Sequence, residues 1–465
     1  MSLPNGFTTA ATAESPRPLH LVGRDGLDGW RQQQPQAAQW LLAHGFDAAP
    51  GTLLALPGGD GNLAGAVLGI GDPLDPYSYA HAPQALPPGD WQVSGEMDAA
   101  ARNALQLGWG LGSYRYTRFR TAPRAPARLS LDALDGETGD VLAACLRVRD
   151  LVNTPAEHLG PEELEHLVRN IAQVHGASCE AIVGDALLAR NFPAIHAVGR
   201  GSQRAPRLLK LQWGDAAHPH VALVGKGVCF DTGGLDLKTA DGMRNMKKDM
   251  GGAAHAIALA ELVMARKLPL RITLLVAAVE NAIGPHAFRP GDVIATRSGV
   301  HVEIDNTDAE GRVILGDALA HAGELGPVLL LDFATLTGAA RIALGPDLPA
   351  LYANDDALAE AWLGAGRQVR DPLWRMPLWR PYLRYLTSNV ADIANSGPSR
   401  MAGSLTAALY LERFVPPQQK WAHLDVYAWN DNDRPGRPTG GEAQGLRAAY
   451  AMLASGRLQA LDVET

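Results

Sequence analysis

The chain has 465 residues, of which 46% are hydrophobic and 19% are charged, a composition that is ordinary for a globular protein and excludes wholesale disorder. Its length suffices for two or three domains with a sizeable core. The formal net charge of -8 disfavours nonspecific binding to nucleic acid or to an anionic membrane. The three cysteines are scattered, which excludes a disulfide framework and a thiolate metal cluster.

The start of the chain has neither the basic residues nor the apolar segment of a signal peptide. The longest apolar runs, such as residues 272–279, have the length of a strand and are too short to cross a bilayer. Together with the cysteine usage, these features predict a cytoplasmic protein with no membrane partner.

Residues 1–135 are rich in Ala, Gly and Pro, with short apolar patches and a predicted helix near 97–111. We expect a small N-terminal α/β domain, in which no group of residues suggests chemistry. Residues 114–128 interleave Arg with Tyr and Phe, a pattern that occurs in nucleic-acid interfaces. A proline-interrupted segment that leads to the next domain explains this run better.

A helix is predicted over residues 139–152, and Asn153-Thr154-Pro155 ends it because the residue before proline resists the α conformation. We assign residues 136–160 to a linker helix. Residues 161–465 would then form a larger, catalytic domain.

Apolar strands and helices alternate through this larger domain. Such an alternation predicts an α/β fold with a mostly parallel central sheet that helices cover on both faces. The expected strands are residues 194–199, 207–213, 221–224, 271–279 and 328–333, and the expected helices are residues 252–267 and 313–324.

Residues 306–312 read Asn-Thr-Asp-Ala-Glu-Gly-Arg and carry a charge at every second position from Asp308. If this segment is extended, Asp308, Glu310 and Arg312 share one face. The segment lies between a strand pattern and a helix pattern, and charges at such a junction mark a site at the carboxyl edge of a sheet. Two carboxylates aimed at one point repel each other unless a cation or a proton lies between them. A solvated surface segment is the alternative, but the setting favours half of a metal site.

The second half of the predicted metal site follows the strand at residues 221–224. Residues 225–234 read Gly-Lys-Gly-Val-Cys-Phe-Asp-Thr-Gly-Gly and contribute Lys226 and Asp231, and Asp249 comes just before the next helix. With Asp308 and Glu310, these residues suit a pair of divalent cations held mainly by oxygen, as in two-metal hydrolases.

Other kinds of site fit these residues less well. Asp231-Thr-Gly is similar to the catalytic strand of an aspartic protease, but that chemistry needs two such aspartates, and the chain has no second Asp-Thr/Ser-Gly. The spacing of a phosphate loop is also absent. His423 and Asp425 form a possible ligand pair, for which a core histidine is the simpler interpretation.

Taken together, the motifs resemble those of the leucyl (cytosol) aminopeptidase family of dinuclear metallo-exopeptidases. The resemblance covers roughly residues 140–430 and follows the family's order and spacing. The matching motifs are Gly225-Lys-Gly-x-x-Phe-Asp-Thr-Gly-Gly, Met246-Lys-x-Asp-Met, Asn306-Thr-Asp-Ala-Glu-Gly-Arg and Ala334-Thr-Leu-Thr-Gly. The resemblance implies a metal-dependent aminopeptidase that removes the first residue from peptides with a free N-terminus.

The resemblance also implies two divalent metal ions per subunit, Zn or Mn, and it assigns their ligands. One ion would be held by Asp231, Asp308 and Glu310, and the other by Lys226, Asp231, Asp249 and Glu310. Lys226 can act as a ligand only as the neutral amine. A buried position beside two dications favours that form.

The same resemblance implies the catalytic roles. A hydroxide that bridges the two metals would attack the scissile carbonyl. Lys238 would stay charged and stabilise the developing oxyanion. Arg312 matches the family's arginine that holds a bicarbonate or carbonate ion, which would serve as the general base.

For the substrate, Thr335, Leu336 and Gly338 match family positions that hold the peptide backbone. Met246 matches a wall of the pocket for the first side chain, which suits Leu or Met. Residues 427–442 depart from the small-residue segment that usually closes this pocket.

Two alternatives stay open, namely a dipeptidase of the Cys-Gly type and an accessory DNA-binding role, which the acidic net charge disfavours. The family typically forms homohexamers, built as dimers of trimers with the N-terminal domain in the packing.

Overall fold

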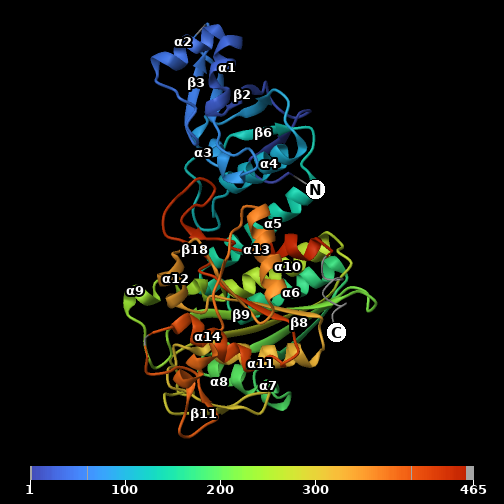
Figure 1. Cartoon of the computed structure of the whole chain (residues 1–465), viewed down its shortest axis with the longest axis vertical. Helices are drawn as coiled ribbons and strands as arrows, with labels where there is room; N and C mark the ends of the chain where they lie inside the picture. The colour runs from blue at the N-terminus through green and yellow to red at the C-terminus, as the bar shows by residue number, and fades with distance from the viewer. Residues whose placement is uncertain (1–2, 60, 400, 457–465) are drawn as a thin grey trace. The chain divides into compact units, whose positions relative to one another are not determined.

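The structure is a computed structural model that describes residues 3–59, 61–399 and 401–456 (Figure 1). The chain forms two compact units. Unit 1 contains the chain up to Leu146 together with Asn432–Thr439, and unit 2 contains Arg147–Asp431 and the chain from Gly440 onward. This division falls within α5 (Gly136–Asn153), whereas the domain boundaries at 135 and 160 stay a prediction from the sequence.

Unit 1 is built on a six-stranded sheet in the order β1-β6-β5-β2-β4-β3. Every neighbouring pair in it is parallel except β3 with β4. Its strands are β1 (Phe7–Thr9), β2 (Arg17–Val22), β3 (Leu53–Pro57), β4 (Leu63–Gly69), β5 (Asp90–Ser94) and β6 (Arg128–Leu131), and its helices include α1 (Leu27–Gln33), α2 (Pro35–Ala43), α3 (Ala82–Ala85) and α4 (Ala99–Ser113). The predicted α/β character of this part is confirmed.

Unit 2 is built on an eight-stranded mixed sheet in the order β15-β14-β17-β13-β9-β10-β8-β7. The central strands β17, β13, β9 and β10 are mutually parallel, and β8 and β7 extend the sheet antiparallel on one side. The strands are β7 (Ser178–Val183), β8 (Arg207–Trp213), β9 (His220–Asp231), β10 (Arg271–Asn281), β13 (Leu329–Ala334), β14 (Ala350–Ala353), β15 (Trp374–Arg375) and β17 (Trp421–Asp425).

Helices cover both faces of this sheet, as the sequence predicts (Figure 1). Helices α6, α10 and α13 lie on one face, and α8, α11 and α14 lie on the other. Burial on both faces explains why the central strands are continuously apolar, with Val221, Ala222 and Leu223 fully buried. The helices are α6 (Pro161–His175), α7 (Ala186–Ala189), α8 (Pro193–Gly199), α9 (Ala240–Met243), α10 (Gly251–Ala265), α11 (Glu310–Glu324), α12 (Gly338–Leu344), α13 (Asp356–Gln368), α14 (Gly403–Glu412) and α15 (Leu446–Ala454).

Smaller pieces complete unit 2. Strands β11 (Val293–Ala295), β12 (His301–Glu303) and β16 (Ile393–Ala394) form a three-stranded sheet, of which β11 and β12 precede the acidic motif at residues 306–312. Strands β18 (Trp429–Asn430) and β19 (Gly440–Gly441) pair at the two ends of the divergent 427–442 segment. No helix in the described part of the chain is long and apolar enough to cross a membrane.

One predicted strand is wrong, because residues 194–199 form helix α8. Pro193 occupies the first position of this helix, where its missing N–H costs nothing. The backbone amides of Ala194 and Ile195 donate to one carboxylate oxygen of Asp317, at 2.8 and 3.2 Å. A carboxylate more than a hundred residues away therefore caps the helix, and a short apolar run alone does not reveal it.

Candidate functional site

Strand β9 carries both Lys226 and Asp231, which are five positions apart. A regular strand would direct two such side chains to opposite faces. However, the register with β10 shifts, because Val228 lies opposite Val279 whereas Asp231 lies opposite Asn281. One extra residue in β9 forms a bulge, and the bulge returns Asp231 to the side of the sheet that Lys226 occupies.

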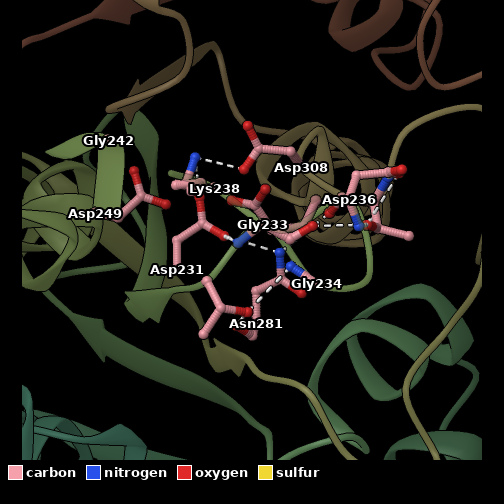
Figure 2. Close-up of polar contacts among 12 residues, drawn as sticks. Asp231, Gly233, Gly234, Asp236, Lys238, Gly242, Asp249, Asn281 and Asp308 are labelled. Carbon is pink, nitrogen blue, oxygen red and sulfur yellow. Dashed lines mark hydrogen bonds and ion pairs between the residues drawn. The ribbon is translucent and has the colours of Figure 1, made fainter. Parts of the chain in front are cut away.

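Asn281 and the turn after β9 hold the carboxylate of Asp231. The backbone N–H of Gly233 and the side-chain amide of Asn281 both donate to Asp231 Oδ1, each at 2.8 Å (Figure 2). Gly233 and Gly234 have φ of +86° and +66°, which L-residues adopt only with strain. The glycines of the motif therefore let the chain turn back tightly enough for the amide of Gly233 to reach Asp231.

Lys226 joins two further acidic residues from other elements. Its Nζ lies 2.8 Å from Asp249 Oδ2 and 3.0 Å from Glu310 Oε1, and it donates to the carbonyl of Thr335 at 3.0 Å. Asp249 belongs to the 3-10 turn Met246–Met250, and Glu310 is the first residue of α11. All three charged side chains are almost completely buried.

Lys238 bridges the other two carboxylates. Its Nζ lies 2.9 Å from Asp231 Oδ2 and forms an ion pair with Asp308 (Figure 2). Oxygens of Asp231, Asp308 and Glu310 all lie within 4.8 Å of one another, so the two halves predicted from the sequence meet at one point.

The motif at residues 306–312 is not extended. The expectation that its charged side chains share one face assumed an extended segment. Helix α11 begins at Glu310, so Arg312 lies in its first turn. Asp308 nevertheless faces the cluster, because its backbone N–H donates to the side chain of Asn306 at 2.8 Å and closes a short turn before the helix. Arg312 donates to the carbonyl of Asn395 at 2.9 Å.

The electrostatics of the cluster fit a cation. Burial and the charge of Asp231 raise the pKa of Asp308 to about 6 and that of Glu310 well above its ordinary value. Burial alone would lower the pKa of Lys226, but Asp249 and Glu310 raise it. The pKa of Lys238 is likewise raised by Asp231 and Asp308 against the effect of burial. Divalent cations among these carboxylates would relieve their repulsion and would favour the neutral amine of Lys226.

A cavity of about 550 Å³ opens beside the cluster. Glu310 does not line it but lies behind it, against Lys226. The remaining residues singled out from the sequence all line it, namely Lys226, Asp231, Lys238, Met246, Asp249, Asp308, Arg312, Thr335, Leu336 and Gly338.

Asp425 supports the loop that follows β13. It accepts hydrogen bonds from the backbone amides of Leu336 and Thr337, at 2.9 and 3.2 Å, and from the hydroxyl of Thr337 at 2.6 Å. Thr337 in turn caps α12. His423, two residues earlier, binds Asp332 at 2.6 Å and is a core residue, as the simpler interpretation held.

Sequence reasoning missed the roles of Asn281 and Lys248, and it considered Asp425 only as a possible metal ligand, whereas Asp425 supports a loop. Asn281 ends an apolar strand as an isolated amide, and its register opposite Asp231 is visible only in the sheet. Lys248 occupies the variable position of the Met-Lys-x-Asp-Met motif and lines the cavity. Burial lowers the pKa of Lys248 to about 8.

Comparison with known proteins identifies the family of the chain. Residues 147–450 match the model of the cytosol aminopeptidase family, catalytic domain, and residues 17–132 match the model of the M17 aminopeptidase N-terminal domain. A probable cytosol aminopeptidase of Syntrophotalea carbinolica is 41% identical over 373 residues, which cover 76% of this chain and 75% of the relative. One of Leifsonia xyli is 36% identical and covers 94% of this chain and 89% of the relative.

Solved structures are similar over nearly the whole chain. The crystal structure of a cytosol aminopeptidase from Coxiella burnetii has a TM-score of 0.93 and 47% identity, and covers 97% of this chain and 99% of that one. The bottromycin maturation enzyme BotP, in complex with Mn, has a TM-score of 0.85 and 32% identity, and covers 95% of this chain and 99% of that one. The chain therefore belongs to the cytosol aminopeptidase family of peptidases.

Proposed function

We propose that the chain is a metal-dependent aminopeptidase that hydrolyses the first peptide bond of substrates with a free N-terminus. The observation that carries this proposal is the meeting of four carboxylates and two lysines beside one cavity. Such a donor set suits two divalent cations, Zn or Mn, and a related structure was solved in complex with Mn.

The ligands that we propose follow the family motifs. Asp231, Asp308 and Glu310 would hold one cation, and Lys226, Asp231, Asp249 and Glu310 would hold the other. When bound, the two cations would polarise the scissile carbonyl and activate water at neutral pH. The amide of Asn281 would fix the orientation of the bridging carboxylate of Asp231.

The remaining residues would bind and orient the substrate. Lys238, held between carboxylates in its charged form, would stabilise negative charge on the carbonyl oxygen. Arg312 would hold a bicarbonate ion at the cavity wall, where the anion accepts a proton. The loop of Thr335, Leu336 and Gly338 would hold the peptide backbone, and Met246 would contact the apolar part of the first side chain, as for Leu or Met.

The assembly and location that we propose are those usual for the family. The protein would act in the cytoplasm as a homohexamer, with unit 1 contributing to the packing of trimers. Size-exclusion chromatography with light scattering tests this assembly directly, because a hexamer has six times the 49.3 kDa mass of the chain.

The first experiment is hydrolysis of aminoacyl-amidomethylcoumarins after removal of metal by chelation and after restoration with Mn²⁺ or Zn²⁺. We expect release from Leu and Met substrates only with metal, and none from N-acetylated substrates. Asp308→Ala should abolish turnover and lower the bound metal per chain. The matched control Asp305→Ala removes an exposed carboxylate of the same segment and should leave both unchanged.

Two results would contradict the proposal. Full activity after exhaustive chelation would show that the reaction does not require metal. Full activity of Asp308→Ala with unchanged metal content would show that the assignment of the metal ligands is wrong. Bicarbonate is tested separately, since its addition to depleted buffer should raise the rate of the wild type but not that of Arg312→Ala.

A further inference from the structure

Two cationic side chains line the cavity without a carboxylate partner. Lys248 comes from the 3-10 turn Met246–Met250, and Arg341 comes from α12. Within residues 3–59, 61–399 and 401–456, neither side chain forms an ion pair with Asp or Glu. The adjacent carboxylate of Asp249 is already taken up by Lys226 at 2.8 Å and by the hydroxyl of Thr335 at 2.9 Å.

Tyr427 holds these two cations beside each other. The Nζ of Lys248 lies 5.0 Å from the centroid of the Tyr427 ring, and the Cζ of Arg341 lies 4.6 Å from it. The Tyr427 hydroxyl donates to Asp431 at 2.9 Å, which fixes the ring. Contact with a ring face attracts a cation but does not neutralise it, so two positive charges remain at the cavity wall.

Two neighbouring cations without a carboxylate partner lower the stability of the folded chain unless an anion binds in the cavity. Lys248 is only 7% exposed, and a buried ammonium without a counter-ion destabilises the folded chain. Charged groups kept in this state gather at binding sites. The alternative is a scaffold in which Lys248 and Arg341 only fix Tyr427, and that alternative predicts no effect on substrate choice.

The position of the pair indicates which part of a substrate it meets. Lys248 follows Met246 by two residues in the same 3-10 turn, and Arg341 follows Gly338 by three residues, nearly one turn of α12. Under the proposed function, Met246 contacts the first side chain and Gly338 holds the backbone beside it. The cations therefore lie on the side of the cavity that receives the first side chain.

We infer that Lys248 and Arg341 bind the side-chain carboxylate of an acidic first residue, so that the enzyme prefers substrates that begin with Glu or Asp over their amide counterparts. This inference rests on the proposed function and assigns its substrate class. Met246 would contact the methylene groups of the acidic side chain. The guanidinium of Arg341 is suited to bidentate binding of a carboxylate.

The test compares Glu-, Gln-, Leu- and Met-amidomethylcoumarin on the metal-loaded full-length protein. None of these substrates has a free C-terminal carboxylate, so the comparison isolates the side chain. We expect kcat/KM for Glu to exceed that for Gln by about tenfold or more, as for a hydrogen-bonded charge pair. Free L-glutamate should likewise inhibit more strongly than L-glutamine.

The variants are Arg341→Gln and Lys248→Met, each of which should lower the Glu-to-Gln ratio by about tenfold. Arg341→Lys keeps a positive charge and should lower the ratio less. Because Arg341 is exposed, its replacement leaves no internal cavity. The matched control is Lys247→Met, since Lys247 Nζ donates to the Asn153 carbonyl at 2.6 Å and does not line the cavity.

The outcomes separate this inference from the proposed function. If the wild type cleaves Leu and Gln substrates but Glu no faster than Gln, the inference is overturned and the proposed function stands. If the wild type cleaves no substrate of the panel, both fail. If the variants lose activity on free dipeptides relative to dipeptide amides while the Glu-to-Gln ratio is unchanged, the cations bind a C-terminal carboxylate and the inference is overturned.

Discussion

Gly311 lies directly against the side chain of Lys226. A Cβ atom added at Gly311 would come within 2.5 Å of Lys226 Cε and 2.6 Å of its Nζ. Backbone conformation does not require glycine here, because Gly311 is an ordinary helical residue of α11. Glycine is required because the side chain of Lys226, which extends to Asp249 and Glu310, occupies the space that a Cβ atom would need.

Gly311→Ala should therefore displace the amine of Lys226. We expect kcat/KM to fall by about a hundredfold and bound metal per chain to decrease, since a misplaced catalytic group costs that much. Gly364→Ala in α13 is the control, because its nearest neighbour is the end of the Arg367 side chain at 3.9 Å. Metal analysis and steady-state kinetics check both variants, and unchanged kinetics in Gly311→Ala would contradict the packing argument.

Asp425→Ala should loosen the loop at Leu336 and Thr337. The loss of a buried acceptor for three donors should lower the free energy of unfolding by about 1–3 kcal/mol. It should also lower kcat/KM by about tenfold or more, because the loop is the proposed backbone clamp. Thr337→Val removes one of these bonds and the cap of α12, but it leaves both backbone amides bonded to Asp425, so it should have a smaller effect on kcat/KM. Urea unfolding and peptide kinetics measure the free energy of unfolding and kcat/KM.

The buried pair of Arg149 and Glu442 anchors the end of the divergent segment. Both nitrogen–oxygen distances are 3.1 Å, and Asn430 donates to the same carboxylate at 2.6 Å. Glu442→Gln should lower the free energy of unfolding by about 3 kcal/mol, because the buried guanidinium loses this counter-charge. Glu412→Gln, at the surface pair with Arg380, should cost less than about 1 kcal/mol. Equal effects of the two changes would contradict the assignment.

His220 should make the fold sensitive to mild acid. Its ring nitrogen lies 2.8 Å from the hydroxyl of Thr273, and burial, with the charge of Arg271, lowers its pKa to about 4. In the unfolded chain the pKa is about 6.5, so between pH 6.5 and 4 the unfolded state binds more protons. The contribution of His220 to stability is thus complete above pH 6.5 and is lost as the pH falls toward 4.

His220→Gln should reduce this pH dependence. We expect the loss of stability between pH 7 and pH 4.5 to be smaller than in the wild type by about 1–2 kcal/mol, measured by urea unfolding at both pH values. The exposed His218→Gln is the control and should leave the pH dependence unchanged. An identical dependence in the wild type and His220→Gln would show that other groups dominate.

The sequence predicts the strands β8, β9, β10 and β13 and the helices α5, α10 and α11, because long apolar runs and helix-start signals are local. It does not predict α8, whose first amides are capped by Asp317 from a distant helix. Similarly, Asp308, Glu310 and Arg312 were expected on one face of an extended segment. The helix instead begins at Glu310, and tertiary packing rather than alternation brings the first two side chains together.

The sequence motifs identify the main residues of the candidate site. They do not identify Asn281, which orients Asp231, or the pair of cations Lys248 and Arg341. Asn281 aligns with Asp231 through strand register, and Lys248 meets Arg341 on the ring of Tyr427. These partners are far apart in the chain, and each one alone is an unremarkable residue. Only the three-dimensional arrangement assigns them a role.

The bulge in β9 also limits how this protein can change in length. Insertion of one residue into β10 between Val279 and Asn281 would restore regular pairing with β9, yet it would turn Asp231 away from Lys226. At these positions the number of residues matters more than their identity. Substitutions of similar size at Cys229 are compatible with the cluster, whereas a single-codon insertion in β10 would make the sheet regular and dismantle the site.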